Sequence, residues 1–103
     1  MPSDVSEVFQ QEKAAIFFHA PWSGPSVQAL ARLEGTGESD IRIINLEIEN
    51  DTVDVLKKEG YPIDGWGEAM VIRSGRVRYF APLARDPATL DLRLAEFLNE
   101  KRA

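Results

Sequence analysis

The spacing of hydrophobic positions along the chain predicts alternating strands and helices. Residues 14–18 are apolar without interruption, which is typical of a short strand covered on both faces. Residues 41–48 are rich in β-branched side chains and predict a second strand. Residues 68–73 and 76–80 flank Ser74-Gly75, a turn sequence between two strand-like runs. Four strands are therefore expected, the last two joined as a hairpin.

Other stretches of the chain have helical spacing. Ser3 or Asp4 can cap a short first helix that runs through about Glu12. After an interruption over residues 21–26, apolar side chains recur every third position up to Gly35, which predicts a second helix. The residues on its apolar side are Val27, Leu30 and Leu33.

Two more helices are expected in the second half of the chain. Asp51 or Thr52 is expected to cap a helix through Lys58. Asp86 followed by Pro87 predicts the start of the last helix, because a capping carboxylate precedes a residue suited to the first helical position. The buried side of this helix is expected to consist of Leu90, Leu94, Phe97 and Leu98.

The order of these elements predicts an α/β fold. Strand, helix and strand followed by a hairpin and a closing helix favour a mixed central sheet of about four strands, flanked by helices on both faces. With 103 residues and no linker-like or repetitive stretch, the chain is expected to form one domain over residues 1–103.

Composition excludes several classes of function. The chain has no cysteine, which removes thiol redox chemistry, cysteine-bound zinc and iron–sulfur clusters. Its single histidine, His19, argues against a histidine-based metal site, so no metal and no cofactor are expected. Twelve basic against 17 acidic residues give a net charge of −5, which argues against nucleic acid and anionic membranes as partners. With no apolar run of transmembrane length and no signal-like start, a cytoplasmic location is expected.

Residues 18–26 read F-H-A-P-W-S-G-P-S and resemble the thioredoxin active-site segment F-W-A-x-W-C-G-P-C. The segment follows a predicted buried strand and opens a predicted helix, as it does in that family. The second half agrees, because Tyr61, Ile63, Gly65 and the Ser74-Gly75 turn resemble the family stretch Y-G-I-x-G-I-P-T and its later N-G hairpin. The resemblance covers nearly the whole chain and implies a thioredoxin-like fold.

The departures from that family concern its redox chemistry. Ser23 and Ser26 stand where thioredoxins have their two cysteines, Phe17 stands at the position of the buried aspartate, and Gly67 stands at that of the cis-proline. A hydroxyl forms no disulfide and is a weak nucleophile without a base. The resemblance therefore implies a redox-inactive member that lacks catalytic residues.

Two residues of the segment allow alternative interpretations. Ser23 can be a nucleophile with His19 as its base, a weak anion-binding position, or an N-cap that accepts a hydrogen bond from the backbone N–H of Ser26. The N-cap is favoured, because no orienting acid and no G-x-S-x-G motif accompany the pair. His19 itself is expected to be packed or at a solvent edge rather than catalytic.

Trp22 and Trp66 lead to the functional hypothesis. The resemblance places them beside the groove in which thioredoxins hold partner polypeptides, although Trp66 can instead fill space inside the fold. A non-catalytic module is therefore expected, such as an adaptor, chaperone-like or assembly factor that binds another polypeptide through this groove, with main-chain groups of Gly67 and Glu68 free for strand-like pairing. The residues assigned to the groove are Trp22, Ser23, Gly24, Pro25, Trp66, Gly67, Glu68, Pro82 and Leu83.

An enzymatic alternative also fits the motif. The natural protein can be a thiol-disulfide oxidoreductase in which both cysteines, at positions 23 and 26, were replaced by serine. This alternative does not explain Phe17 or Gly67, which also depart from the thioredoxin pattern. The sequence leaves the partner and the oligomeric state undetermined.

Overall fold

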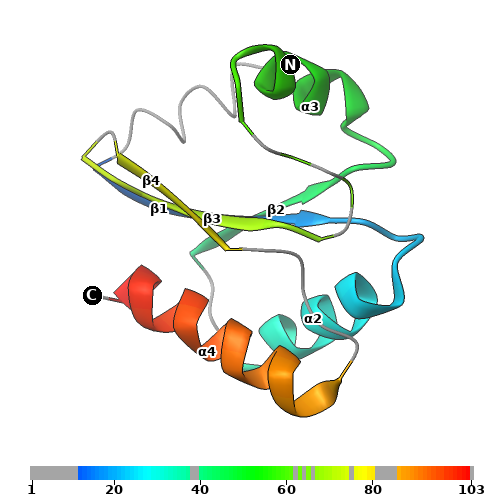
Figure 1. Cartoon of the computed structure of the whole chain (residues 1–103), viewed down its shortest axis with the longest axis vertical. Coiled ribbons are helices and arrows are strands. Elements are labelled where there is room, and N and C mark those ends of the chain that lie inside the picture. The colour runs from blue at the N-terminus through cyan, green and yellow to red at the C-terminus, as the bar shows by residue number, and fades with distance from the viewer. Residues whose placement is uncertain are drawn as a thin grey trace.

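The described part of the chain contains a four-stranded mixed sheet and three helices (Figure 1). The computed structural model describes residues 12–37, 40–61, 63, 65, 67–74, 76–80 and 86–102. The strands are β1 (Lys13–His19), β2 (Ile41–Asn45), β3 (Ala69–Arg73) and β4 (Arg76–Phe80). The helices are α2 (Gly24–Gly35), α3 (Asn50–Lys58) and α4 (Pro87–Arg102). The expected α/β class and the mixed sheet of four strands are confirmed.

The strand order is β2-β1-β3-β4, so β1 lies inside the sheet between two neighbours. β1 pairs parallel with β2 and antiparallel with β3, and β3 pairs antiparallel with β4 across the predicted hairpin. The parallel pair requires a crossover, which α2 provides, because a tight turn can join only antiparallel strands. This topology places the segment after β1 at one end of the sheet.

Alternate residues of β1 belong to two separate hydrophobic clusters, because successive side chains of a strand point to opposite faces. Ile16 and Phe18 pack with Val53 and Leu56 of α3. The intervening Phe17 packs in the other cluster with apolar residues of α2 and α4, which include Leu33, Leu90, Leu94, Phe97 and Leu98. The uninterrupted apolar run of β1 is explained by this double burial.

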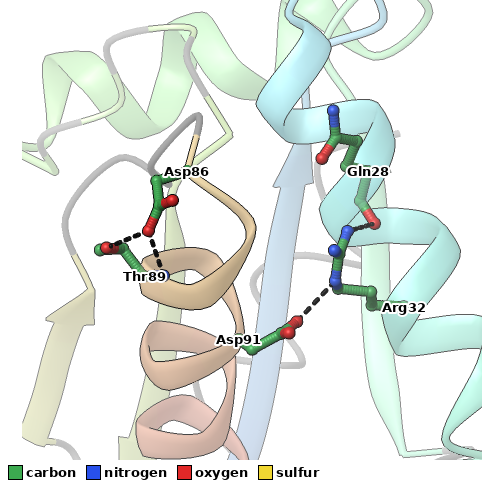
Figure 2. A network of polar contacts seen from close by, with 5 residues as sticks. All are labelled: Gln28, Arg32, Asp86, Thr89 and Asp91. Atoms are coloured by element: carbon green, nitrogen blue, oxygen red, sulfur yellow. Dashed lines mark hydrogen bonds and ion pairs between the residues drawn. The ribbon is translucent and has the colours of Figure 1, made fainter.

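The start of α4 is fixed as the sequence predicts. One carboxylate oxygen of Asp86 accepts hydrogen bonds from the backbone N–H and the hydroxyl of Thr89, at 3.0 and 2.8 Å (Figure 2). These hydrogen bonds lower the pKa of the Asp86 carboxyl. Nearby, Arg32 Nε of α2 lies 2.6 Å from a carboxylate oxygen of Asp91 of α4. Both side chains are partly exposed, so this ion pair adds about 1 kcal/mol at most to the packing between the helices.

Several local predictions are wrong. Val27 is 48% exposed, and Ser26 and Ala29 share the buried side of α2 with Leu33 instead. The N-cap of α3 is Glu49 rather than Asp51 or Thr52, and it makes no side-chain capping hydrogen bond. The second strand ends at Asn45, three residues before the predicted end, because the backbone turns there and the N–H groups of Ile48 and Glu49 donate to the Asn45 carbonyl. The first predicted helix lies outside the described residues.

No helix in the described part of the chain is both long and apolar enough to cross a membrane.

The orientation of α4 can be tested with two leucines that lie two positions apart. Leu90 is fully buried, whereas Leu92 is 66% exposed. Leu90→Ala should lower the free energy of unfolding by about 2–5 kcal/mol, because it leaves a cavity in the core. Leu92→Ala should change it by no more than about 0.5 kcal/mol. Urea denaturation of both variants measures the difference, and equal losses would contradict this orientation.

Candidate functional site

The turn between β1 and α2 holds the segment that the sequence singled out. Ser23 occupies the N-cap position of α2 with extended backbone angles, and its N–H donates to the Ala20 carbonyl at 3.0 Å. Pro25 lies in the first turn of the helix, where its missing N–H costs no hydrogen bond. The predicted cap position is correct, but the predicted hydrogen bond is wrong, because the Ser23 side chain makes no capping interaction.

The hydroxyl of Ser26 connects this turn to the end of β1. It accepts a hydrogen bond from the Ala20 N–H at 2.9 Å, and it lies 3.0 Å from Nδ1 of His19. Ser26 is fully buried, so its hydroxyl exchanges these contacts for water only if the turn opens. Sequence reasoning paired His19 with Ser23, but the structure pairs it with Ser26, one helical turn further along.

His19 is buried beside this serine, and its ring centroid lies 6.2 Å from that of Phe17. Burial lowers the pKa of His19 below its usual 6.5, while the negative charge of Glu34 and the contact with Ser26 partly oppose this. In the neutral ring with its proton on Nε2, Nδ1 accepts the hydroxyl hydrogen of Ser26. The pair therefore forms a complete hydrogen-bonding unit while the ring is uncharged.

Gly67 approaches Ser26 more closely than any larger residue allows. A Cβ added to Gly67 would lie 2.8 Å from the Cβ of Ser26 and 2.9 Å from its Oγ. The φ angle of Gly67 is +103°, which proline cannot adopt and which side chains other than glycine rarely adopt. The segment before β3 therefore touches the first turn of α2 at a position that only glycine fits.

Trp22 lies on the surface beside Gly65. Its side chain is 60% exposed, and its indole Nε1–H donates to the carbonyl oxygen of Gly65 at 2.9 Å. The ring also passes close to Gly65, where an added Cβ would lie 3.5 Å from it. The polar group of the indole is thus satisfied within the protein, and the apolar ring is held against the segment before β3 with most of its surface in solvent.

Glu68 also contacts the segment before β3, from its buried side. It is buried, and its Oε1 accepts a hydrogen bond from the Gly65 N–H at 3.1 Å. Its backbone carbonyl accepts the N–H of Phe18 at 2.8 Å, which extends the pairing of β3 with β1. The Glu68 carbonyl is therefore already engaged, contrary to the expectation that it would be free for a partner strand.

The assigned groove residues divide into three groups. Trp22 and Gly24 are exposed and Pro25 is half-buried, so these three lie at the surface. Ser23, Gly67 and Glu68 are buried and support that surface. The remaining three lie outside the described residues, so their place relative to Trp22 stays a prediction; they are Trp66, Pro82 and Leu83.

The chemistry available at this site is limited. The serine that contacts His19 is fully buried, so a substrate cannot reach its hydroxyl without displacing the helix. Among the described residues, no group of histidine and carboxylate side chains is arranged to hold a metal ion.

A scan of family models found no match for this chain, and neither did a search of curated proteins.

The burial of His19 predicts a pH-dependent stability. The folded protein binds a proton at His19 less readily than the unfolded chain, in which the pKa is near 6.5. The contribution of His19 to the free energy of unfolding should therefore be complete above about pH 7, and the free energy of unfolding should decrease as the pH drops below about 6.5. Urea denaturation from pH 7.5 to 5 measures this slope. His19→Gln should flatten it, and an equal slope in that variant would contradict the assignment.

Proposed function

We propose that this chain is a non-catalytic thioredoxin-like module that binds another polypeptide at a surface centred on Trp22. The fold is consistent with this family. A parallel β-α-β unit leads to an antiparallel hairpin and a closing helix, and the W-S-G-P-S segment follows the inner strand β1 and opens α2. The two hydrophobic clusters, with α3 residues in one and α2 and α4 residues in the other, support helices on both faces of the sheet.

The observation that carries the binding proposal is the exposure of Trp22. An indole contributes little to folding when it is 60% exposed, yet tryptophan is among the residues most enriched at interface hot spots. Its hydrogen bond to Gly65 fixes the ring before a partner arrives. A fixed ring loses little conformational freedom on binding, which favours affinity.

The surroundings of Trp22 suit a polypeptide better than a small molecule. Gly24 is exposed and Pro25 half-exposed beside it, so an extended chain can approach the backbone of the turn closely. Their lack of long side chains leaves the indole as the main apolar contact. The proposed surface also includes Trp66, Pro82 and Leu83, on the strength of the family resemblance alone.

The contacts of Ser26 weigh against the enzymatic alternative. Its hydroxyl is an acceptor for a backbone N–H and a partner for a histidine, whereas a thiol is a weak hydrogen-bonding group. Gly67 and His19, which both differ from the thioredoxin pattern, each contact Ser26. Serine, histidine and glycine therefore form a matched set, which favours a native serine at position 26 over a substituted cysteine.

The binding surface can be tested with Trp22→Ala. Peptides selected from a random library for binding to the unmodified chain should bind this variant at least about tenfold more weakly, a loss of about 1.4 kcal/mol. Fluorescence polarisation with labelled peptides measures the affinity. The free energy of unfolding should fall by only about 1 kcal/mol, because the lost contacts are one hydrogen bond and a partly buried ring.

Leu92→Ala provides the matched control, since it removes an equally exposed apolar side chain from α4. Its peptide affinities should equal those of the unmodified chain. Failure to select any binding peptide, or full binding by Trp22→Ala, would contradict the proposal. A loss of stability of about 3–5 kcal/mol in Trp22→Ala would instead assign the indole to the core.

The enzymatic alternative has its own test. The double variant Ser23→Cys, Ser26→Cys should reduce insulin disulfides at least about tenfold more slowly than an ordinary thioredoxin, because Phe17 supplies no proton acceptor and Gly67 replaces the cis-proline. The unmodified chain, which has no cysteine, should show no activity above the dithiothreitol background. Thioredoxin-like rates in the double variant would favour the oxidoreductase.

A further inference from the structure

The end of the sheet opposite Trp22 carries a row of basic side chains. Lys13 of β1 pairs in register with Arg73 of β3, and Arg73 pairs in register with Arg76 of β4. Directly paired residues of antiparallel strands project from the same face, so three cations stand side by side across three strands. Lys13 and His19 mark the two ends of β1, which places this row about 20 Å from the turn that bears Trp22.

A fourth cation, Arg78, lies on that same face, because it pairs with Val71 of the cluster that α4 covers. Glu100 of α4 partly balances the group. One of its carboxylate oxygens lies 3.3 Å from Arg78 Nη1, and its backbone carbonyl accepts a hydrogen bond from Arg73 Nη2 at 2.6 Å. Arg76 is exposed and forms no ion pair with a described residue. Like charges directly opposite each other destabilise a sheet, so the cations of the row repel one another across the strands.

A groove of about 410 Å³ between β4 and the end of α4 is lined by Arg73, Arg76, Arg78 and Glu100, together with Val71 and Val77. β4 is the outermost strand, and within the described part of the chain it pairs only with β3. Its outer backbone N–H and C=O groups are thus placed to pair with a further strand. The groove offers positive charge and an open strand edge at the same place.

We propose that this edge binds an acidic extended peptide, which adds to the sheet as a strand beside β4. Arg76 and Arg78 are two residues apart on one face, which separates them by about 6.6–6.8 Å along the strand. Carboxylates at alternate positions of an extended peptide have the same spacing, so one acidic side chain can face each arginine. Each guanidinium can hold a carboxylate through two parallel hydrogen bonds.

Two comparisons favour a peptide at this edge. The other outer strand, β2, has a single arginine, Arg42, whose Nη2 lies 3.2 Å from a carboxylate oxygen of Glu49. On β4, Arg78 is paired with Glu100, but Arg76 forms no ion pair with a described residue. A nucleic acid could neutralise the arginines, but it cannot pair with the backbone of β4. The net charge of −5 also repels a long polyanion more strongly than it repels a short peptide.

The test uses the whole chain and the synthetic peptide Ac-T-E-V-E-V-T-NH2, followed by NMR titration at low salt. The peptide should shift the backbone amide signals of β4, and its affinity should fall as salt is added. The double variant Arg76→Gln, Arg78→Gln should bind it at least about tenfold more weakly, about 1.4 kcal/mol. Lys57→Gln, which removes an exposed cation from α3, should bind it within about twofold of the unmodified chain.

Two further probes separate strand pairing from charge attraction alone. Two altered peptides should each bind at least about tenfold more weakly. One has glutamine in place of both glutamates, and the other has proline in place of the valine between the two glutamates. The proposal is overturned by the absence of binding, by equal losses in Lys57→Gln and the double variant, or by shifts confined to the amides around Trp22. It is also overturned if a short oligonucleotide binds the arginines more tightly than the peptide does.

Discussion

The arrangement of the candidate site depends on the buried hydroxyl of Ser26. It joins the Ala20 N–H and the His19 ring at the end of β1 to the first turn of α2, and its Cβ sets the distance at which Gly67 can pass. A buried hydroxyl is costly unless it is hydrogen-bonded, so these contacts hold only in one arrangement of strand, turn and helix. The position of α2 and that of the segment before β3 are therefore coupled through one side chain.

The position of Trp22 follows from this coupling. The turn that Ser26 fixes carries the indole, and the segment that Gly67 brings close carries the Gly65 carbonyl that accepts its N–H. Glu68 completes the arrangement by holding the Gly65 N–H from the other side. The aromatic side chain of Trp22 is exposed with its polar group satisfied, whereas Ser26 and His19 are buried.

Charge is distributed unevenly over the chain in a way that its net value conceals. A total of −5 describes an acidic protein, yet Lys13, Arg73, Arg76 and Arg78 gather on one face of three adjacent strands. The two ends of the sheet thus differ in chemistry, since one carries Trp22 and the other carries a row of cations.

The pattern of apolar and polar residues is enough to predict the kinds of elements and most of the core. The uninterrupted apolar run of β1 reflects its burial on both faces. For the last helix, Asp86-Pro87 predicts the start and leucines at helical spacing predict the buried side. The family resemblance implied that Trp22 lies at the surface, and the position of Ser23 at a helix N-terminus could be anticipated from its local turn. Such features depend on neighbours within a few residues, which a linear pattern records.

The contacts between residues far apart in the chain depend on the tertiary structure. Ser23 and Ser26 look equivalent in the motif, but the helix buries one hydroxyl against His19 and leaves the other at the cap without a capping bond. The approach of Gly67 to Ser26 and the alignment of Lys13, Arg73 and Arg76 join segments far apart in the chain, through strand register and through packing. Register and packing are set by the fit of all the elements together, and no local spacing encodes them.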